Sequence, residues 1–141
     1  MQFQTGTTVG TITFALTIEN NPPQTTTLTI PPAAITLDSV TAVRQPGEID
    51  VAVAGFDNTY SASQLAFTFY DLNSNAIPQG VISVDAASEF QPYFGGTQFG
   101  GMFQLLLKFP VTGNAAEIGF VSAGITNSVG TTTTQPVAIA N

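Results

Sequence analysis

The sequence contains no cysteine, no histidine and no tryptophan. The absence of cysteine excludes a disulfide framework, a thiolate metal site and a cysteine nucleophile. The absence of histidine removes the commonest general base and the usual transition-metal ligand. Carboxylates such as Asp50, Asp57 and Glu117 are scattered, and no spacing argument pairs two of them as a glycosidase would require. We therefore expect a protein that is not an enzyme and that carries no cofactor.

Charge is scarce as well. Charged residues make up only 8 % of the chain, and nine acidic residues outnumber two basic ones, Arg44 and Lys108, for a net charge of −7. This negative charge repels phosphate backbones and anionic lipid, so nucleic acid is a poor candidate partner. No apolar run approaches the ~20 residues that span a bilayer, so we expect no membrane insertion. The opening residues MQFQ lack the features of a secretory signal, and we expect an exported form to be a mature product or an excised piece.

What the sequence has in quantity is alternation of apolar and polar residues, with the period of two that is typical of β-strands. Beyond Pro32 such runs recur at the spacing of an all-β sandwich, with turn residues between them. They predict seven strands, near residues 35–44, 48–56, 64–71, 81–85, 102–111, 118–126 and 131–138. A short helical turn is expected at residues 86–94, ended by Pro92. The predicted fold is all-β, an immunoglobulin-like β-sandwich preceded by a hairpin.

The seven predicted strands form a complete sandwich without the hairpin that precedes them. Residues 9–19 and 25–30 each alternate apolar side chains with threonine, and Pro31 and Pro32 then end the pairing. We therefore divide the chain into a hairpin with its Pro-Pro linker, residues 1–34, and a sandwich, residues 35–141. The predicted apolar face of the hairpin consists of Ile12, Phe14, Leu16, Ile18, Leu28 and Ile30.

An isolated hairpin is marginally stable in water at best, and this one would leave its six apolar side chains exposed to solvent. We therefore expect another sheet to cover them. A sheet of a second copy would do so by strand complementation, and a repeated head-to-tail contact would build an oligomer or filament. The alternative is that the hairpin folds back on its own sandwich.

The segment FQTGTTVGTITFALTI, residues 3–18, resembles the closing strands of tandem immunoglobulin-like modules in large secreted or cell-surface proteins of Acidobacteria-type bacteria. Residues 109–113, FPVTG, and 126–131, TNSVGT, resemble parts of the next module in such arrays. The resemblance implies that residues 1–34 are the last hairpin of one module and residues 35–141 a complete one. It also implies an extracellular or surface location and no catalytic residues.

An aromatic segment, FQPYFGGTQF at residues 90–99, supports a second hypothesis. As an exposed loop it would serve an adhesion or carbohydrate-binding module, because aromatic faces stack on sugars. The candidate contacts with a glycan or surface protein are Phe90, Tyr93, Phe94 and Phe99. Most phenylalanines, however, fall at inward positions such as Phe67 and Phe69, which favours a core role. A third hypothesis is a passive spacer in a large adhesin.

Two smaller motifs have alternative interpretations. Asp71, Asn73 and Asn75 have the spacing of a calcium loop but lack its glycine and its distal glutamate, so a plain turn competes with a loose calcium site, shared with Asp57 or Asp85.

Lys108 lies in an apolar run. It would form an isopeptide crosslink if it met Asn127 or Asn141 beside Glu48 or Glu117. The competing interpretation is an edge-strand lysine that discourages stray pairing.

Overall fold

The computed structural model of the protein describes residues 6–19, 21–96 and 100–141. This part of the chain is built from strands, one helix and one 3₁₀ turn. In chain order they are β1 (Gly10–Leu16), β2 (Gln24–Ile30), β3 (Thr36–Gln45), β4 (Glu48–Phe56), β5 (Gln64–Asp71), β6 (Ala76–Asp85), α1 (Ala87–Gly96), β7 (Met102–Pro110), η1 (Ala115–Glu117), β8 (Ile118–Thr126), β9 (Thr131–Thr133) and β10 (Val137–Ala140). The expectation of an all-β protein is confirmed.

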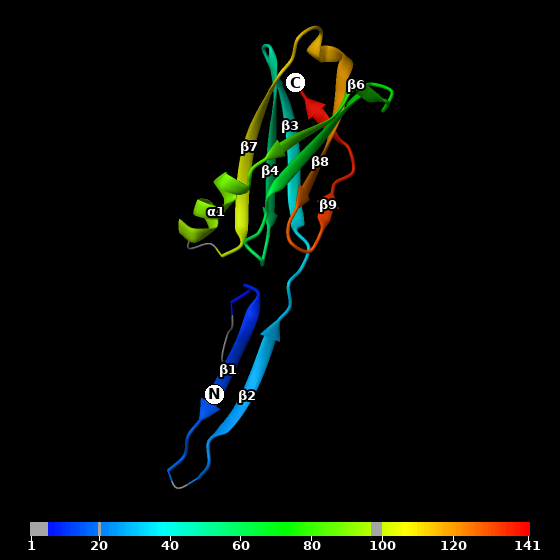
Figure 1. The fold of residues 1–141 in the computed structure, drawn as a ribbon. Helices are drawn as coiled ribbons and strands as arrows, with labels where there is room; N and C mark the ends of the chain where they lie inside the picture. The colour runs from blue at the N-terminus through cyan, green and yellow to red at the C-terminus, as the bar shows by residue number, and fades with distance from the viewer. Residues whose placement is uncertain (1–5, 20, 97–99) are drawn as a thin grey trace.

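Strands β1 and β2 form an antiparallel hairpin that extends away from the rest of the chain (Figure 1). Ile12 pairs with Leu28 and Gly10 pairs with Ile30, which places the apolar residues of both strands on one face. The opposite face carries the pairs Thr11 with Thr29 and Thr13 with Thr27. The predicted hairpin and its two-faced character are therefore present.

The remaining strands form one continuous sheet in the order β6-β5-β8-β10-β3-β4-β7, with β9 paired to β8. Strand β10 joins the two halves, because it runs parallel to β3 and antiparallel to β8. Phe109 on β7 makes edge-on ring contacts with Phe67 and Phe69 on β5, although β5 and β7 lie far apart in the sheet order. The sheet is therefore curled around its core. We call this part, residues 35–141, the body.

The core lies on the concave side of the curled sheet. Inward residues alternate with outward ones along β4 and β5, as the period-two pattern predicted. Phe67 and Phe69 belong to the core, as expected. The fully buried apolar side chains are Ile49, Val51, Val53, Phe67, Val121, Ala123 and Ile125. Burial of side chains of this size contributes about 1.5–3 kcal/mol each, which makes this cluster the main source of stability in the body.

Three elements differ from the sequence prediction. Strand β6 begins at Ala76 rather than near residue 81, because an edge strand tolerates Pro78, whose missing N–H faces no neighbour. Helix α1 continues to Gly96, so Pro92 lies inside it instead of ending it. The single strand expected at residues 131–138 is split into β9 and β10, with Pro136 between them.

Candidate functional site

The hairpin carries the residues predicted for self-association. Leu16 is 59 % exposed, Ile18 54 % and Leu28 46 %, whereas Ile12, Phe14 and Ile30 are partly buried. Ile18 lies just beyond β1, where its carbonyl accepts a hydrogen bond from the Asn21 N–H (3.0 Å). The alternative, in which the hairpin folds back on the body, is not seen for the three most exposed side chains. They present an apolar surface to solvent.

The base of the hairpin is fixed to the loop that follows β4. The Asn58 side chain donates to the Pro31 carbonyl (2.9 Å) and accepts from the Ala33 N–H (3.0 Å). The Val9 N–H donates to the Asn58 carbonyl (2.9 Å), so both strands of the hairpin are held at this residue. We call the contacts of residues 57–60 with residues 8–9 and 31–33 the junction. It fixes the direction in which the hairpin leaves the body.

Asp57 lies beneath the junction and is fully buried. Its Oδ1 accepts from the Thr59 N–H (3.0 Å), the Thr59 hydroxyl (2.6 Å) and the Asn127 amide (3.0 Å). Its Oδ2 accepts from the N–H groups of Ser61 (2.9 Å) and Ala62 (2.8 Å). Burial alone would raise the pKa of Asp57, but these hydrogen bonds outweigh burial and hold the pKa below its usual value. The carboxylate is thus a structural acceptor for the loop.

Asn127 connects this carboxylate to the linker. Its amide donates to the Ala33 carbonyl (2.9 Å) as well as to Asp57, and its Oδ1 accepts from the N–H groups of Val129 (3.0 Å) and Gly130 (3.2 Å). Sequence reasoning considered Asp57 as a possible calcium ligand and Asn127 as a possible isopeptide partner, and it missed this network. The available signal was a polar pair directly after a buried strand.

Residues 90–96 of the aromatic segment lie in α1 and do not form an exposed loop. Phe90 and Phe94 are buried, stack on each other and pack edge-on against Phe103. They are not accessible to a surface ligand, in agreement with the core interpretation, because α1 turns them toward the sheet. Tyr93 is 41 % exposed, and Phe99 lies outside the described residues.

The motif from Asp71 to Asn75 forms a turn. Asp71 Oδ1 accepts from the N–H groups of Asn73 and Asn75 (2.8 Å each), and Oδ2 accepts from the Asn75 amide (3.1 Å). The hydrogen bonds from Asn75 hold the pKa of Asp71 below its usual value. Among the described residues no group of three or more Asp, Glu, His or Cys side chains is placed to hold a metal ion. The motif therefore caps the β5–β6 turn.

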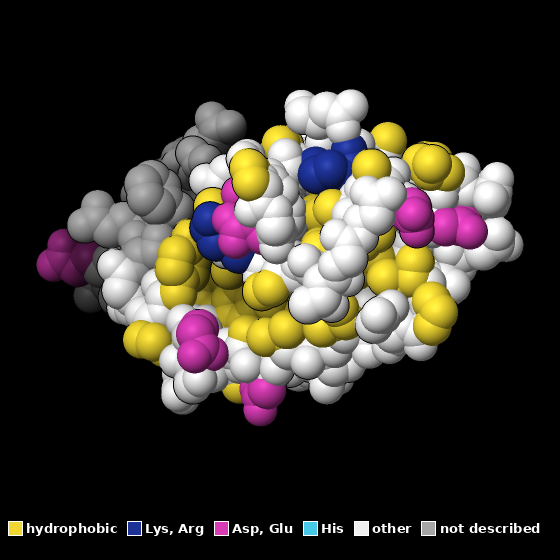
Figure 2. Space-filling model, turned by 90° about the horizontal axis from the view of Figure 1, so that it is seen from above, with side chains coloured by type: hydrophobic (Ala, Val, Ile, Leu, Met, Phe, Trp, Pro, Cys, Tyr) yellow, Lys and Arg dark blue, Asp and Glu magenta, His cyan; other side chains and the backbone are white. Residues whose placement is uncertain are grey.

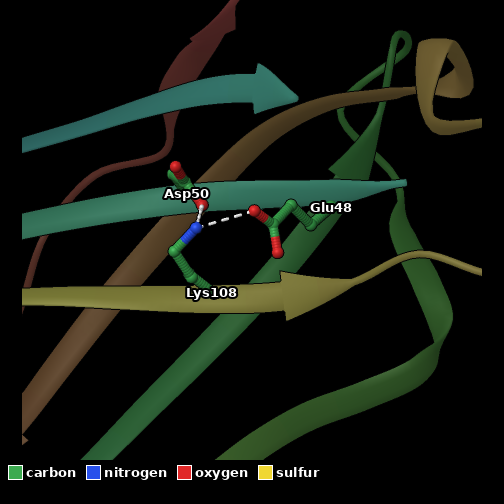
Figure 3. A network of polar contacts seen from close by, with 3 residues as sticks. All are labelled: Glu48, Asp50 and Lys108. Atoms are coloured by element: carbon green, nitrogen blue, oxygen red, sulfur yellow. Dashed lines mark hydrogen bonds and ion pairs between the residues drawn. The ribbon is translucent and has the colours of Figure 1, made fainter. Parts of the chain in front are cut away.

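Lys108 points along the outer face of the sheet from β7 toward β4 (Figure 3). Its Nζ lies 2.8 Å from Glu48 Oε1 and 3.7 Å from Asp50 Oδ1. The hydrogen bond that Lys108 donates to Glu48 and the charge of Asp50 raise the pKa of Lys108. The side chain is 57 % exposed. Asn127 is engaged with Asp57, and Asn141 accepts from Arg44, so the isopeptide partners are not assembled around Lys108.

A broad hollow opens at the end of the body that lies away from the hairpin. Its volume is about 460 Å³, and it is bounded by β6 on one side and by the end of β7 on the other. A view down onto this end shows hydrophobic side chains gathered on it (Figure 2), and the lining of the hollow also includes Asp71, Gln79, Thr112, Asn114 and Glu117. Sequence analysis did not identify it, because its walls come from strands that meet only in the curled sheet.

No helix in residues 6–19, 21–96 and 100–141 is long and apolar enough to cross a membrane. No protein-family model matches the chain, and no curated protein matches its sequence. A solved structure is similar in fold, that of a DUF3823 family protein from Bacteroides ovatus ATCC 8483. The two share 7 % sequence identity at a TM-score of 0.51, over 89 % of this chain and 68 % of the other. The likeness concerns the fold alone.

Proposed function

We propose that the protein is a non-enzymatic structural module of an extracellular or cell-surface protein, which self-associates by strand complementation through the hairpin β1–β2. The observation that carries this proposal is the apolar face on which Leu16, Ile18 and Leu28 remain exposed at 46–59 %. Exposed apolar surface on a projecting element is typical of a protein interaction site. The junction holds the hairpin away from the body, where a second copy can reach it.

The composition of the hairpin supports the same function. Neither β1 nor β2 contains a charged residue or a proline. Natural proteins protect exposed strand edges with lysine, proline or bulges, and these two strands lack such protection. Their threonine and isoleucine content favours strand pairing.

The body fits the proposed role as one variant of an immunoglobulin-like sandwich. Strands β3, β4 and β7 would form one layer and β5, β6 and β8 the other, with β10 connecting them. The contact of Phe109 with Phe67 and Phe69 supports this facing arrangement.

The test compares the assembly state of the parent chain with that of two variants. We expect deletion of residues 1–31, and separately the double substitution Leu16→Ser with Leu28→Ser, to give monomers under conditions in which the parent forms oligomers or filaments. The matched control changes the opposite face, Thr13→Ser with Thr27→Ser, and should assemble like the parent. Light scattering and electron microscopy provide the readout.

An assembly state that does not change on deletion would refute the proposal. A parent that remains monomeric would favour the passive spacer, and binding of a monomer on a glycan array would favour the adhesion module.

A further inference from the structure

The curled sheet does not close on itself. Among the described residues its two edge strands are β6 and β7, each paired on one side only. The chain passes between them through α1, whose Phe90 and Phe94 cover Phe103 near the start of β7. The remainder of both edges is not covered by this helix.

Side chains on β7 that face the core are less buried than their partners on β4. Ile49, Val51 and Val53 of β4 are 0 % exposed. Each is paired with a β7 residue that is only partly buried, namely Phe109, Leu107 and Leu105 respectively. Because paired residues share a face of the sheet, these β7 side chains point toward the core and still retain access to solvent.

Side chains on the other edge strand, β6, are likewise less buried than their partners on the neighbouring strand β5. Phe67 and Leu65 on β5 are buried, whereas their partners on β6, Ile82 and Val84, are only partly buried. We call the apolar strip between the two edges the seam. It is lined by Ile77, Ile82, Val84, Leu105, Leu107 and Phe109.

One end of the seam widens into the hollow of about 460 Å³, which Ile77, Ile82 and Phe109 help to line. Ile49 and Phe69, at the back of the hollow, belong to the core. An apolar strand laid along the seam would therefore extend the core itself.

The hairpin matches the seam in length and in its apolar pattern. Its strands have seven residues each, about 23 Å at the usual strand rise, and β7 has nine. Alternate residues are apolar in β1 from Ile12 to Leu16, and β2 adds Leu28 and Ile30 to the same face, as required to fill a strip lined by the inward residues of two strands. The segment Met102–Phe109 contains neither proline nor glycine, so the outer edge of β7 is suited to main-chain pairing. Lys108 does not block this edge, because it is drawn toward β4 by Glu48.

The hairpin leaves one end of the body, and the ends of β6 and β7 that line the hollow lie at the other end (Figure 1). Strand β4 connects the two ends, because Ile49 near its start lines the hollow and Asp57 just after its end lies beneath the junction. The distance between these two residues is roughly 25 Å at the rise of a strand. A contact between the hairpin of one copy and the seam of the next is therefore head-to-tail, and it repeats along one direction.

We propose that the seam between β6 and β7 is the acceptor for the β1–β2 hairpin of a second copy of this chain. This inference rests on the proposed function and identifies the surface that completes it. The hairpin's apolar face covers the half-buried side chains of the seam, and one of its strands pairs with the free edge of β7.

The absence of cysteine allows a direct test in the full chain. A Leu16→Cys chain is mixed with a differently tagged Leu107→Cys chain under mild oxidation, and disulfide-linked heterodimers are identified by mass. The matched control replaces the next residue, Leu106→Cys, which lies on the outer face of the same strand and is 64 % exposed. The Leu107→Cys and Leu106→Cys chains are each also mixed with a Leu28→Cys chain, because the proposal does not specify which strand of the hairpin pairs with β7 or in which register.

We expect heterodimers with Leu107→Cys and their loss with Leu106→Cys. Cross-links only to Leu106→Cys, or only between two Leu16→Cys chains, would overturn the seam as acceptor and leave self-association through the hairpin intact. Assemblies that form without any of these cross-links would also overturn it. Chains that remain monomeric by light scattering would overturn both proposals.

Discussion

The substitution Asp57→Asn tests whether the junction depends on a buried carboxylate. An asparagine at this position keeps the size of the side chain but replaces one acceptor oxygen with an NH₂ group. If that group takes the place of Oδ2, the N–H groups of Ser61 and Ala62, now 2.9 and 2.8 Å from the oxygen, lose their acceptor. An unsatisfied buried donor costs about 1–3 kcal/mol, so two of them lower the free energy of unfolding by about 2–6 kcal/mol.

The same variant has a predicted pH signature. Because hydrogen bonds hold the pKa of Asp57 below its unfolded value, the ionised carboxylate stabilises the folded state. That contribution is complete above the unfolded pKa, near pH 4 for an aspartate, and is lost as the pH falls through the folded pKa. The parent should therefore lose stability in acid more steeply than Asp57→Asn does.

Urea unfolding followed by far-ultraviolet circular dichroism, repeated from neutral pH down to the acid range, measures both effects. The control is Asp38→Asn, which changes an exposed carboxylate on β3 and should have little effect. A loss of stability no larger than that of the control, or an acid slope equal to the parent's, would refute the assignment of Asp57 as a structural acceptor.

Two further predictions concern the same region. Gly101→Ala should destabilise the body by roughly 1–3 kcal/mol, because the added Cβ would lie 2.1 Å from the Asp57 carbonyl oxygen. The control Gly95→Ala, whose added Cβ meets no atom within 4 Å, should leave the thermal unfolding close to that of the parent. Asn58→Ala removes the hydrogen bonds to Pro31 and Ala33, so we expect faster amide exchange at the base of the hairpin with an unchanged circular dichroism spectrum. Unchanged exchange would show that Asn58 does not fix the hairpin.

The strands of the core could be predicted from the sequence because each buries one face. The predicted limits of β4, β5 and β8 coincide with the observed ones, since alternation places every second residue of β4 and β5 in the core and β8 is a largely buried run. The start of β6 was missed because Pro78 and Gly80 hide a strand signal, and both are tolerated at an edge. The helix was predicted to be shorter because Pro92 was taken as its end.

The candidate site could be predicted only where its residues are neighbours in the sequence. The alternation in residues 12–18 identifies the apolar face of the hairpin, because Ile12 and Leu16 lie within one strand. Beneath the junction, Asp57 is hydrogen-bonded to Asn127, which is 70 positions further along the chain. The seam depends on the curl of the sheet, and the curl depends on β10, whose four residues pair with β3 and β8. A strand this short has no sequence signal that distinguishes its two partners.

The hairpin and the seam are each incomplete, and the size of the hydrophobic term indicates why a contact would need both. Complete burial of a leucine or isoleucine side chain contributes about 1.5–3 kcal/mol, and Leu16, Ile18 and Leu28 are already about half buried, so covering them contributes about 2–5 kcal/mol together. Association of two proteins costs an estimated 4–15 kcal/mol in lost freedom, so these three side chains would at best leave assembly near balance. Coverage of the partly buried Leu105, Leu107 and Ile82 adds further hydrophobic stabilisation. Main-chain hydrogen bonds to β7 would also fix the orientation of the added strand. A hairpin that met a flat surface would lack both additions, and it is this difference that favours the seam over the outer face of the sheet.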